Sequence, residues 1–225
     1  MSDEPLAMLR LLQISDSAFP SGSFAFSGGL ETLAADGLVT DVASLDDFLR
    51  GQAIPRWAGM DRWFIRKARD AAPDAKVLAD LDRFCEAHVA VEALGEASRR
   101  VGLATLTTHS RMGTPGAAAY RARVVTGEVH GHAPIVQGLI GSGLALPAGA
   151  VDAGALYSAV NSVATAAIRL GIVGALEAQT LLAGLGIAMA EALAAEPPLL
   201  PSAFTPLADI AVSRRAGQAG RLFSS

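Results

Sequence analysis

The chain has 225 residues, a formal net charge of −4 and a pI near 5.5, and its Lys and Arg residues are scattered. This length suits one large domain, and the lack of a basic stripe argues against nucleic acid as a partner. The single cysteine, Cys85, excludes an internal disulfide and a thiolate metal cluster built from this chain alone. The first residues are acidic where a secretory signal would be basic, so we expect a cytoplasmic protein.

The first informative segment is the Phe-, Ser- and Gly-rich run over residues 11–31. Pro20 fixes its own φ and Gly22 permits backbone angles closed to other residues. The run therefore predicts the end of one helix, an irregular turn and the start of a second helix. Either Ser21 or Ser23 is expected to cap that second helix.

The segments that follow have helical spacing. Ser44, with Asp47 three residues later, predicts a helix start, and Pro55 is expected to kink or end that helix. Asp74 begins another helical segment, and residues 77–106 keep apolar positions three and four apart. We find no alternating strand pattern, so the predicted fold class is all-α.

Residues 133–151 carry no charge, in a chain that is 51% apolar with a mean hydropathy of +0.37. The length would allow a membrane span, but Pro134, Pro147 and several glycines interrupt the stretch. We expect a buried core helix here. A membrane-embedded helical protein, which would need detergent for extraction, is the alternative.

Residues 152–185 carry two apolar stripes, one through Leu156 and one through Tyr157, which predicts a central helix that is apolar on two faces. Arg169 is one of its few polar interruptions and must find a partner or an aqueous opening. Together these elements predict a single domain, residues 1–225, made of roughly ten helices around this one.

One constellation could bind metal: Glu128, His130 and His132 alternate along the chain and would share a face if the segment were extended. Imidazole suits nickel and zinc, and a carboxylate could complete a site. Two histidines beside a glycine also occur in loops that enter helices, where they form hydrogen bonds. A metal-dependent enzyme using these three residues is therefore a further alternative.

Known catalytic and nucleotide motifs are absent from the sequence. It has no phosphate-binding loop, no complete dinucleotide fingerprint and no serine-hydrolase elbow. We therefore predict no catalytic residue and no tightly bound cofactor.

The C-terminal segment 214–225 combines glycines with charged and apolar residues, namely Arg214, Arg215, Arg221, Leu222 and Phe223. Such a composition suits a frayed terminus, and it equally suits a mobile tail that becomes ordered on a partner.

Several of these motifs resemble one family, the urease accessory protein UreF. The opening run, from Leu11 to Glu31, is the most specific. The other points of resemblance follow in family order: Gly131-His132 with Pro134 and Gly138, Arg169-Leu170 with Gly174 and Gln179, and Arg221-Leu222-Phe223. The chain departs from the family where a proline and a glutamine are usual, at Ile172 and Ala175, and Ser224 replaces the last arginine of the tail.

The resemblance implies an all-helical adaptor without catalysis of its own. It implies a homodimer that binds a UreD/UreH-type protein, and with it brings the GTPase UreG to the urease apoenzyme. It further implies an effect on GTP hydrolysis and transient handling of Ni²⁺, without nucleic acid or membrane as a partner.

On this basis we expect two groups of site residues. The partner-binding residues are Phe19, Pro20, Gly22, Phe24, Ser27, Gly29, Glu31, Arg214, Arg215, Arg221, Leu222 and Phe223. A possible nickel route is lined by Glu31, His132 and Arg169.

Overall fold

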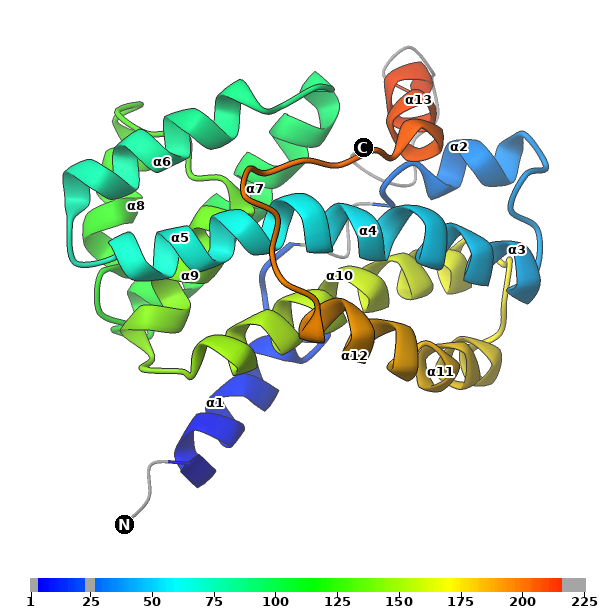
Figure 1. Cartoon of the computed structure of the whole chain (residues 1–225), viewed down its shortest axis with the longest axis horizontal. Coiled ribbons are helices and arrows are strands. Elements are labelled where there is room, and N and C mark those ends of the chain that lie inside the picture. The colour runs from blue at the N-terminus through cyan, green and yellow to red at the C-terminus, as the bar shows by residue number, and fades with distance from the viewer. Residues whose placement is uncertain (1–3, 23–26, 216–225) are drawn as a thin grey trace. The chain divides into compact units, whose positions relative to one another are not determined.

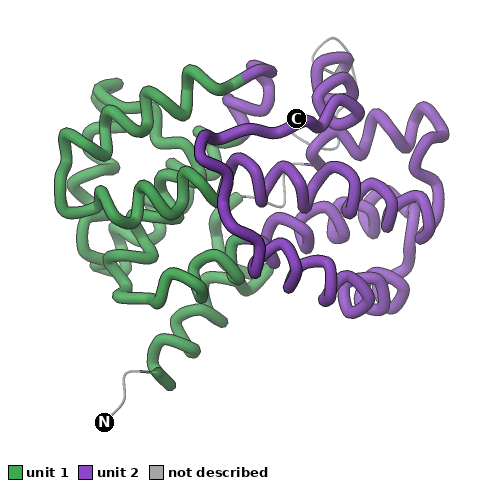
Figure 2. The backbone as a smooth tube through the Cα atoms, in the orientation of Figure 1, with its two compact units in different colours: residues 1–22, 61–89, 98–155 green, residues 23–60, 90–97, 156–225 purple. Residues whose placement is uncertain are grey.

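The computed structural model describes residues 4–22 and 27–215, of Arg215 only the helical backbone. Over these residues every regular element is a helix and none is a strand (Figure 1), which confirms the predicted all-α class. The chain divides into two compact units, which Figure 2 colours separately. The extent of one domain over residues 1–225 stays a prediction, and each unit is described by itself.

Unit 1 comprises Met1–Gly22, Asp61–Val89 and Ser98–Ala155. Its helices are α1 (Glu4–Ser15), α5 (Arg62–Ala71), α6 (Ala75–Ala87), α8 (Ala117–Val125), α9 (Ala133–Gly143) and parts of α7 (Glu92–Arg111) and α10 (Ala148–Arg169). Its core lies between α5 and α9, where Phe64, Ile65 and Ile135 are fully buried. A Cβ on Gly138 would lie 2.3 Å from the Ile65 carbonyl oxygen, so only glycine allows this close helix pair.

Unit 2 comprises Ser23–Met60, Ala90–Ala97 and Leu156–Ser225. Its helices are α2 (Leu30–Ala35), α3 (Val42–Phe48), α4 (Ile54–Arg56), α11 (Ala175–Gly184), α12 (Gly186–Ala194), α13 (Pro206–Arg215) and the remaining residues of α7 and α10. Its core includes Leu30, Leu45, Leu49, Leu185 and Val212, all fully buried.

Pro55 does not end its helix, so that one of the two outcomes predicted for it is wrong. Helical backbone continues from α3 through α4 to α5, with π-helical turns at Leu49–Ala53 and Trp57–Asp61. In the first of these turns the Ile54 N–H donates to the Leu49 carbonyl, five residues back. A π-helical turn widens the helix just before the proline, which accommodates its ring and its missing donor.

Two predicted helix starts also need correction. The cap of α3 is Asp41, whose carboxylate accepts from the Ser44 N–H at 2.9 Å while the Ser44 hydroxyl faces back to the Asp41 N–H. The cap of α2 is Gly29, which leaves Ser21 in the preceding turn, whereas Ser23 lies outside the described residues. By contrast, Asp74 caps α6 as expected, accepting from two N–H groups of its first turn.

The uncharged stretch 133–151 forms two helices rather than one. α9 ends at Gly143 and α10 begins at Ala148, and the turn between them contains Ala145 at a φ of 54°. Over residues 4–22 and 27–215, no single helix has both the length and the hydropathy of a membrane span. α11 and α12 meet that test only as a pair, across a bend of 40°.

The predicted helix over 152–185 is likewise divided. α10 ends at Arg169 because Gly171, at a φ of 73°, forms a left-handed terminus in which the Ile172 N–H donates to Ala167. Gly174 then caps α11. One predicted stripe of α10, through Leu156, is buried, but Tyr157 of the second stripe is 41% exposed.

Candidate functional site

The loop that carries the two histidines is built around Asp82 of α6, in unit 1. The Asp82 carboxylate is fully buried and accepts from the backbone N–H groups of His130, Gly131 and His132, at 2.6, 2.8 and 3.1 Å. Gly131 has a φ of 76°, which turns the three donors toward one point. A buried carboxylate with three backbone donors is well satisfied, and it fixes the shape of the loop.

α7 closes over the other side of this loop. A Cβ on Gly102 would lie 1.9 Å from the Gly131 carbonyl oxygen, so α7 can approach only because residue 102 is glycine. One turn earlier on α7, the Ser98 hydroxyl accepts from the Ala133 N–H at 3.0 Å, in the first turn of α9. The loop is therefore held by α6 from one side and by α7 from the other.

His132 is buried and hydrogen-bonded through both ring nitrogens. Its Nε2 lies 2.5 Å from Oε2 of Glu86, and its Nδ1 lies 3.1 Å from the Ser98 hydroxyl. The Ser98 oxygen already accepts from Ala133, so its proton is available for Nδ1. We therefore assign the neutral tautomer with the proton on Nε2, which donates to Glu86.

The electrostatics agree with a neutral His132 beside an ionised Glu86. Burial lowers the pKa of His132, and the hydrogen bond to Glu86 offsets only part of this effect. Burial alone would raise the pKa of Glu86, but hydrogen bonds from His132 and from Arg99, at 2.9 Å, outweigh it and hold that pKa below its ordinary value. Glu86 thus carries a negative charge that Arg99 balances.

The predicted metal-binding trio is only partly brought together. His130 is partly exposed, and its Nδ1 lies 3.5 Å from Oε2 of Glu86. Glu128 instead pairs with Arg123 at 2.6 Å, and this hydrogen bond lowers the Glu128 pKa. Within the described part of the chain, no three His, Cys, Asp or Glu side chains are placed to hold a metal ion. The metal role of the trio stays a prediction.

The first half of the opening run, also in unit 1, packs on α7. The Phe19 ring lies 5.1 Å from the ring of His109, and the Pro20 carbonyl accepts from the Thr108 hydroxyl at 3.1 Å. Gly22 adopts a φ of 73°, and a Cβ added at this position would contact Ala104. Proline and glycine thus form the irregular turn that the sequence predicts, and Pro20 is exposed on it.

The second half of the run lies in unit 2, against α13. Ser27, Gly29 and Glu31 are all buried within the chain. A Cβ on Gly29 would lie 3.0 Å from both the Ala208 carbonyl oxygen and the Ala211 Cβ. These three residues therefore face the chain's own core in this structure, and their contact with a partner stays a prediction.

The remaining predicted residues lie at or beyond helix ends. Arg214, on α13, forms two hydrogen bonds with the Asp36 carboxylate that follows α2. Arg169 is exposed at the last position of α10, where a cation stabilises the negative end of the helix dipole. Outside the described residues, or without a described side chain, are Phe24, Arg215, Arg221, Leu222 and Phe223. Glu31 and Arg169 belong to unit 2 and His132 to unit 1, so the nickel route stays a prediction.

Sequence reasoning missed the residues that hold the histidine loop, namely Asp82, Glu86, Ser98 and Arg99. One signal was present, because Asp82 lies on the same face of α6 as the buried Leu78 and Cys85. A charged residue at such a position requires partners, but the sequence does not say which. The hydrogen bonds hold the loop in one conformation, and its polar groups and those of the neighbouring helices are partners for one another.

Comparison with known proteins gives one consistent family. Residues 39–186 match the sequence model of the UreF family. The chain is 31% identical over 221 residues to the urease accessory protein UreF of Arthrobacter sp. (strain FB24), covering 96% of each chain. It is 32% identical to the protein of the same name from Rhizobium etli, over 97% of this chain and 96% of that one. It is 34% identical to the one from Mesorhizobium japonicum, over 82% of this chain and 80% of that one.

Proposed function

The chain belongs to the UreF family of urease accessory proteins, and from this premise we propose that it acts in urease maturation as an adaptor without catalysis of its own. It joins a UreD/UreH-type protein and the GTPase UreG on the urease apoenzyme. In that complex it modulates GTP hydrolysis and assists the insertion of nickel into the urease active site.

The observation that carries this proposal is the similarity to UreF proteins over nearly the whole chain. The structure supports an adaptor in a second way, because large apolar side chains lie on its surface. The most exposed are Leu176, Ile187, Leu199 and Phe204, all in unit 2. Side chains of this kind are available for contact with partner proteins.

The finer features of this role are part of the same proposal. The adaptor works in the cytoplasm as a homodimer within the complex. It holds no cofactor tightly, and Ni²⁺ passes through the complex as cargo. The partner-binding surface includes Pro20 on its exposed turn and the tail from Arg214 to Phe223.

The tail assignment is tested by deleting residues 216–225 and measuring co-purification with the UreD/UreH-type protein. We expect the complex to be lost while the circular dichroism spectrum and the melting temperature are unchanged, because α13 ends before the deletion. The matched control carries the same ten residues in scrambled order, so that length and charge are kept. A retained complex in the deletion variant would refute the tail assignment.

The nickel route is tested by combining Glu31→Gln, His132→Asn and Arg169→Gln, which keep a polar side chain while removing charge or a ligand nitrogen. We expect the complex to assemble but the urease it activates to contain less nickel. Wild-type nickel content in urease matured by the triple variant would end the route hypothesis.

A further inference from the structure

The edge between α5 and α6 in unit 1 carries a cluster of aromatic rings. Phe64 is fully buried and lies 5.1 Å from Trp63, 6.0 Å from Phe84 and 5.9 Å from His88, measured between ring centroids. Above this buried ring, Phe84 is 38% exposed, whereas Trp63 and His88 are half-buried. The cluster therefore has an inner ring in the core and an outer layer at the surface.

The outer rings are held in place before any partner arrives. His88 meets Phe84 edge to face at 4.3 Å, and its Nδ1 lies 2.8 Å from the Phe84 carbonyl oxygen. Trp63 lies 5.9 Å from Phe84, between α5 and α6. Rings that are already fixed lose little conformational entropy on binding, which favours their use as anchors.

The apolar surface extends along α6. Val77, Leu81 and Phe84 follow the i, i+4, i+7 spacing, and Val77 is 50% exposed. From Val77 to His88 this stripe covers about three helical turns, roughly 16 Å. A surface of this length and form matches one amphipathic helix laid along it.

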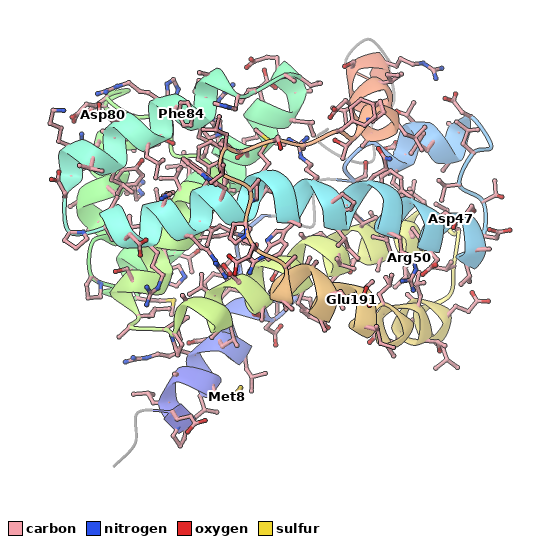
Figure 3. All side chains as sticks on the ribbon, viewed as in Figure 1. Met8, Asp47, Arg50, Asp80, Phe84 and Glu191 are labelled. Carbon is pink, nitrogen blue, oxygen red and sulfur yellow. The ribbon has the colours of Figure 1, made fainter. Side chains whose placement is uncertain are left out.

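Charged side chains border this apolar patch. Lys67 lies 5.7 Å from the centre of the Trp63 ring and is exposed. On the outer rim of α6, Lys76 and Arg83 share the single carboxylate of Asp80, so this side of the patch also keeps a net positive charge (Figure 3 labels Asp80 and Phe84). The apolar patch is thus bordered by cations on both helices, with Lys67 at its α5 side.

From these observations we propose that Trp63, Lys67, Val77, Leu81, Phe84 and His88 form a docking surface for an acidic amphipathic helix of a partner protein. The apolar face of that helix covers the aromatic rings, and a carboxylate at its edge pairs with Lys67 above Trp63. This inference rests on the proposed function, because the partner is one of the proteins that the adaptor joins.

The experiment measures the affinity of the full-length chain for three purified probes: the UreD/UreH-type protein, the UreG-type GTPase and apo-urease. We expect Phe84→Ala to weaken the binding of one probe by about tenfold or more, as for other buried aromatic anchors. Lys67→Glu should weaken the same probe and should also reduce the salt dependence of its binding. Because Lys67 is exposed, this second variant keeps the test valid if Phe84→Ala impairs folding.

The controls are Lys76→Glu, which makes the same charge change at an exposed lysine that is not one of the six docking residues, and Val125→Ser, which changes an exposed apolar residue on α8; both should leave every affinity unchanged. Unchanged binding of all three probes to folded Phe84→Ala and Lys67→Glu variants would overturn the docking proposal alone. If the unaltered chain binds none of the probes, the proposed function fails and the docking proposal fails with it. A loss of self-association in Phe84→Ala, without a change in any probe affinity, would make the patch a contact between copies and would likewise overturn the proposal.

Discussion

Asp82 and Glu86 are one helical turn apart on α6 and stabilise the same loop by different means. Asp82 is fully buried and accepts hydrogen bonds from three backbone donors in the loop, whereas Glu86 is partly exposed and bonds to the side chains of His132 and Arg99. Asp82 therefore determines the backbone shape of the loop. Glu86 determines the tautomer and the orientation of His132.

Replacing Asp82 with Asn should destabilise the chain strongly. The amide keeps the size of the carboxylate, but it removes the charge and turns an NH₂ group toward backbone donors. We expect a loss of roughly 2 to 4 kcal/mol in the free energy of unfolding, measured by urea denaturation. The control is Asp80→Asn on the same helix, whose exposed ion pairs with Lys76 and Arg83 contribute little to stability. Equal effects of the two substitutions would contradict the role given to Asp82.

His109 should make the stability of the chain depend on pH. Its ring is buried against Phe19, its Nδ1 lies 2.9 Å from the Thr114 hydroxyl, and burial lowers its pKa from 6.5 to about 4. The folded state favours the neutral ring, so the stabilisation is fully present above pH 6.5 and is lost as the pH falls toward 4. The full loss amounts to about 3 kcal/mol.

The measurement is the free energy of unfolding between pH 7 and pH 5, a window in which most carboxylates stay ionised. His109→Asn keeps an acceptor for Thr114 and removes the titration, so its stability should fall less steeply with acid than that of the unaltered chain. His132, whose pKa is also lowered by burial, leaves part of the slope in place. Identical slopes for the two proteins would show that His109 does not titrate in this way.

At the scale of elements, the two adjacent glycines before α2 are required for different reasons, backbone conformation in one case and close packing in the other. Gly28 and Gly29 both have positive φ values, 60° and 91°. A Cβ on Gly28 would meet nothing within 4 Å, whereas one on Gly29 would press on the backbone and side chains of α13. The first glycine is therefore needed for its conformation alone, and the second also for the contact between α2 and α13.

We expect Gly28→Ala to lower the free energy of unfolding by about 1 kcal/mol, the usual cost of a left-handed alanine. Gly29→Ala should cost about 1 to 3 kcal/mol more, because α13 must also shift away from α2. Thermal or urea unfolding of the two variants provides the comparison. If they are equally stable, α13 is not packed against Gly29 as described.

Much of the element pattern could be predicted from the sequence, since the periodicity gives the helices and Asp74 marks one of their starts. The errors occur where a local signal competes with another interaction. A proline such as Pro55 normally ends a helix, but here the π-helical turns on either side accommodate it. Gly171 and Ala145 end helices that the apolar composition alone would continue, because composition does not report φ.

The site was less predictable than the fold, for the same reason. The alternating motif of Glu128, His130 and His132 predicted a site at the histidines. In the structure Glu128 pairs with its neighbour Arg123 instead. The carboxylate that reaches His132 is that of Glu86, far away in the sequence. Gly102 shows the limit most clearly, because its role depends on a carbonyl of a loop in a distant part of the chain. Such contacts follow from how helices pack in space, which residue spacing does not specify.

At the scale of the whole molecule, membership of the UreF family and the all-α fold agree with each other. The described side chains in the histidine loop are largely satisfied by one another, while large apolar residues remain exposed on several helices. These features fit the proposed role as an adaptor. The proposed role therefore requires that the chain support urease maturation together with its partners.

The most direct measurement is the nickel content and activity of urease made from the gene set that accompanies this chain, expressed with and without it. We expect nickel-poor, inactive urease when the chain is omitted, and restored nickel loading when it is supplied from a second gene. Urease with full nickel content and activity in the absence of the chain would contradict the account.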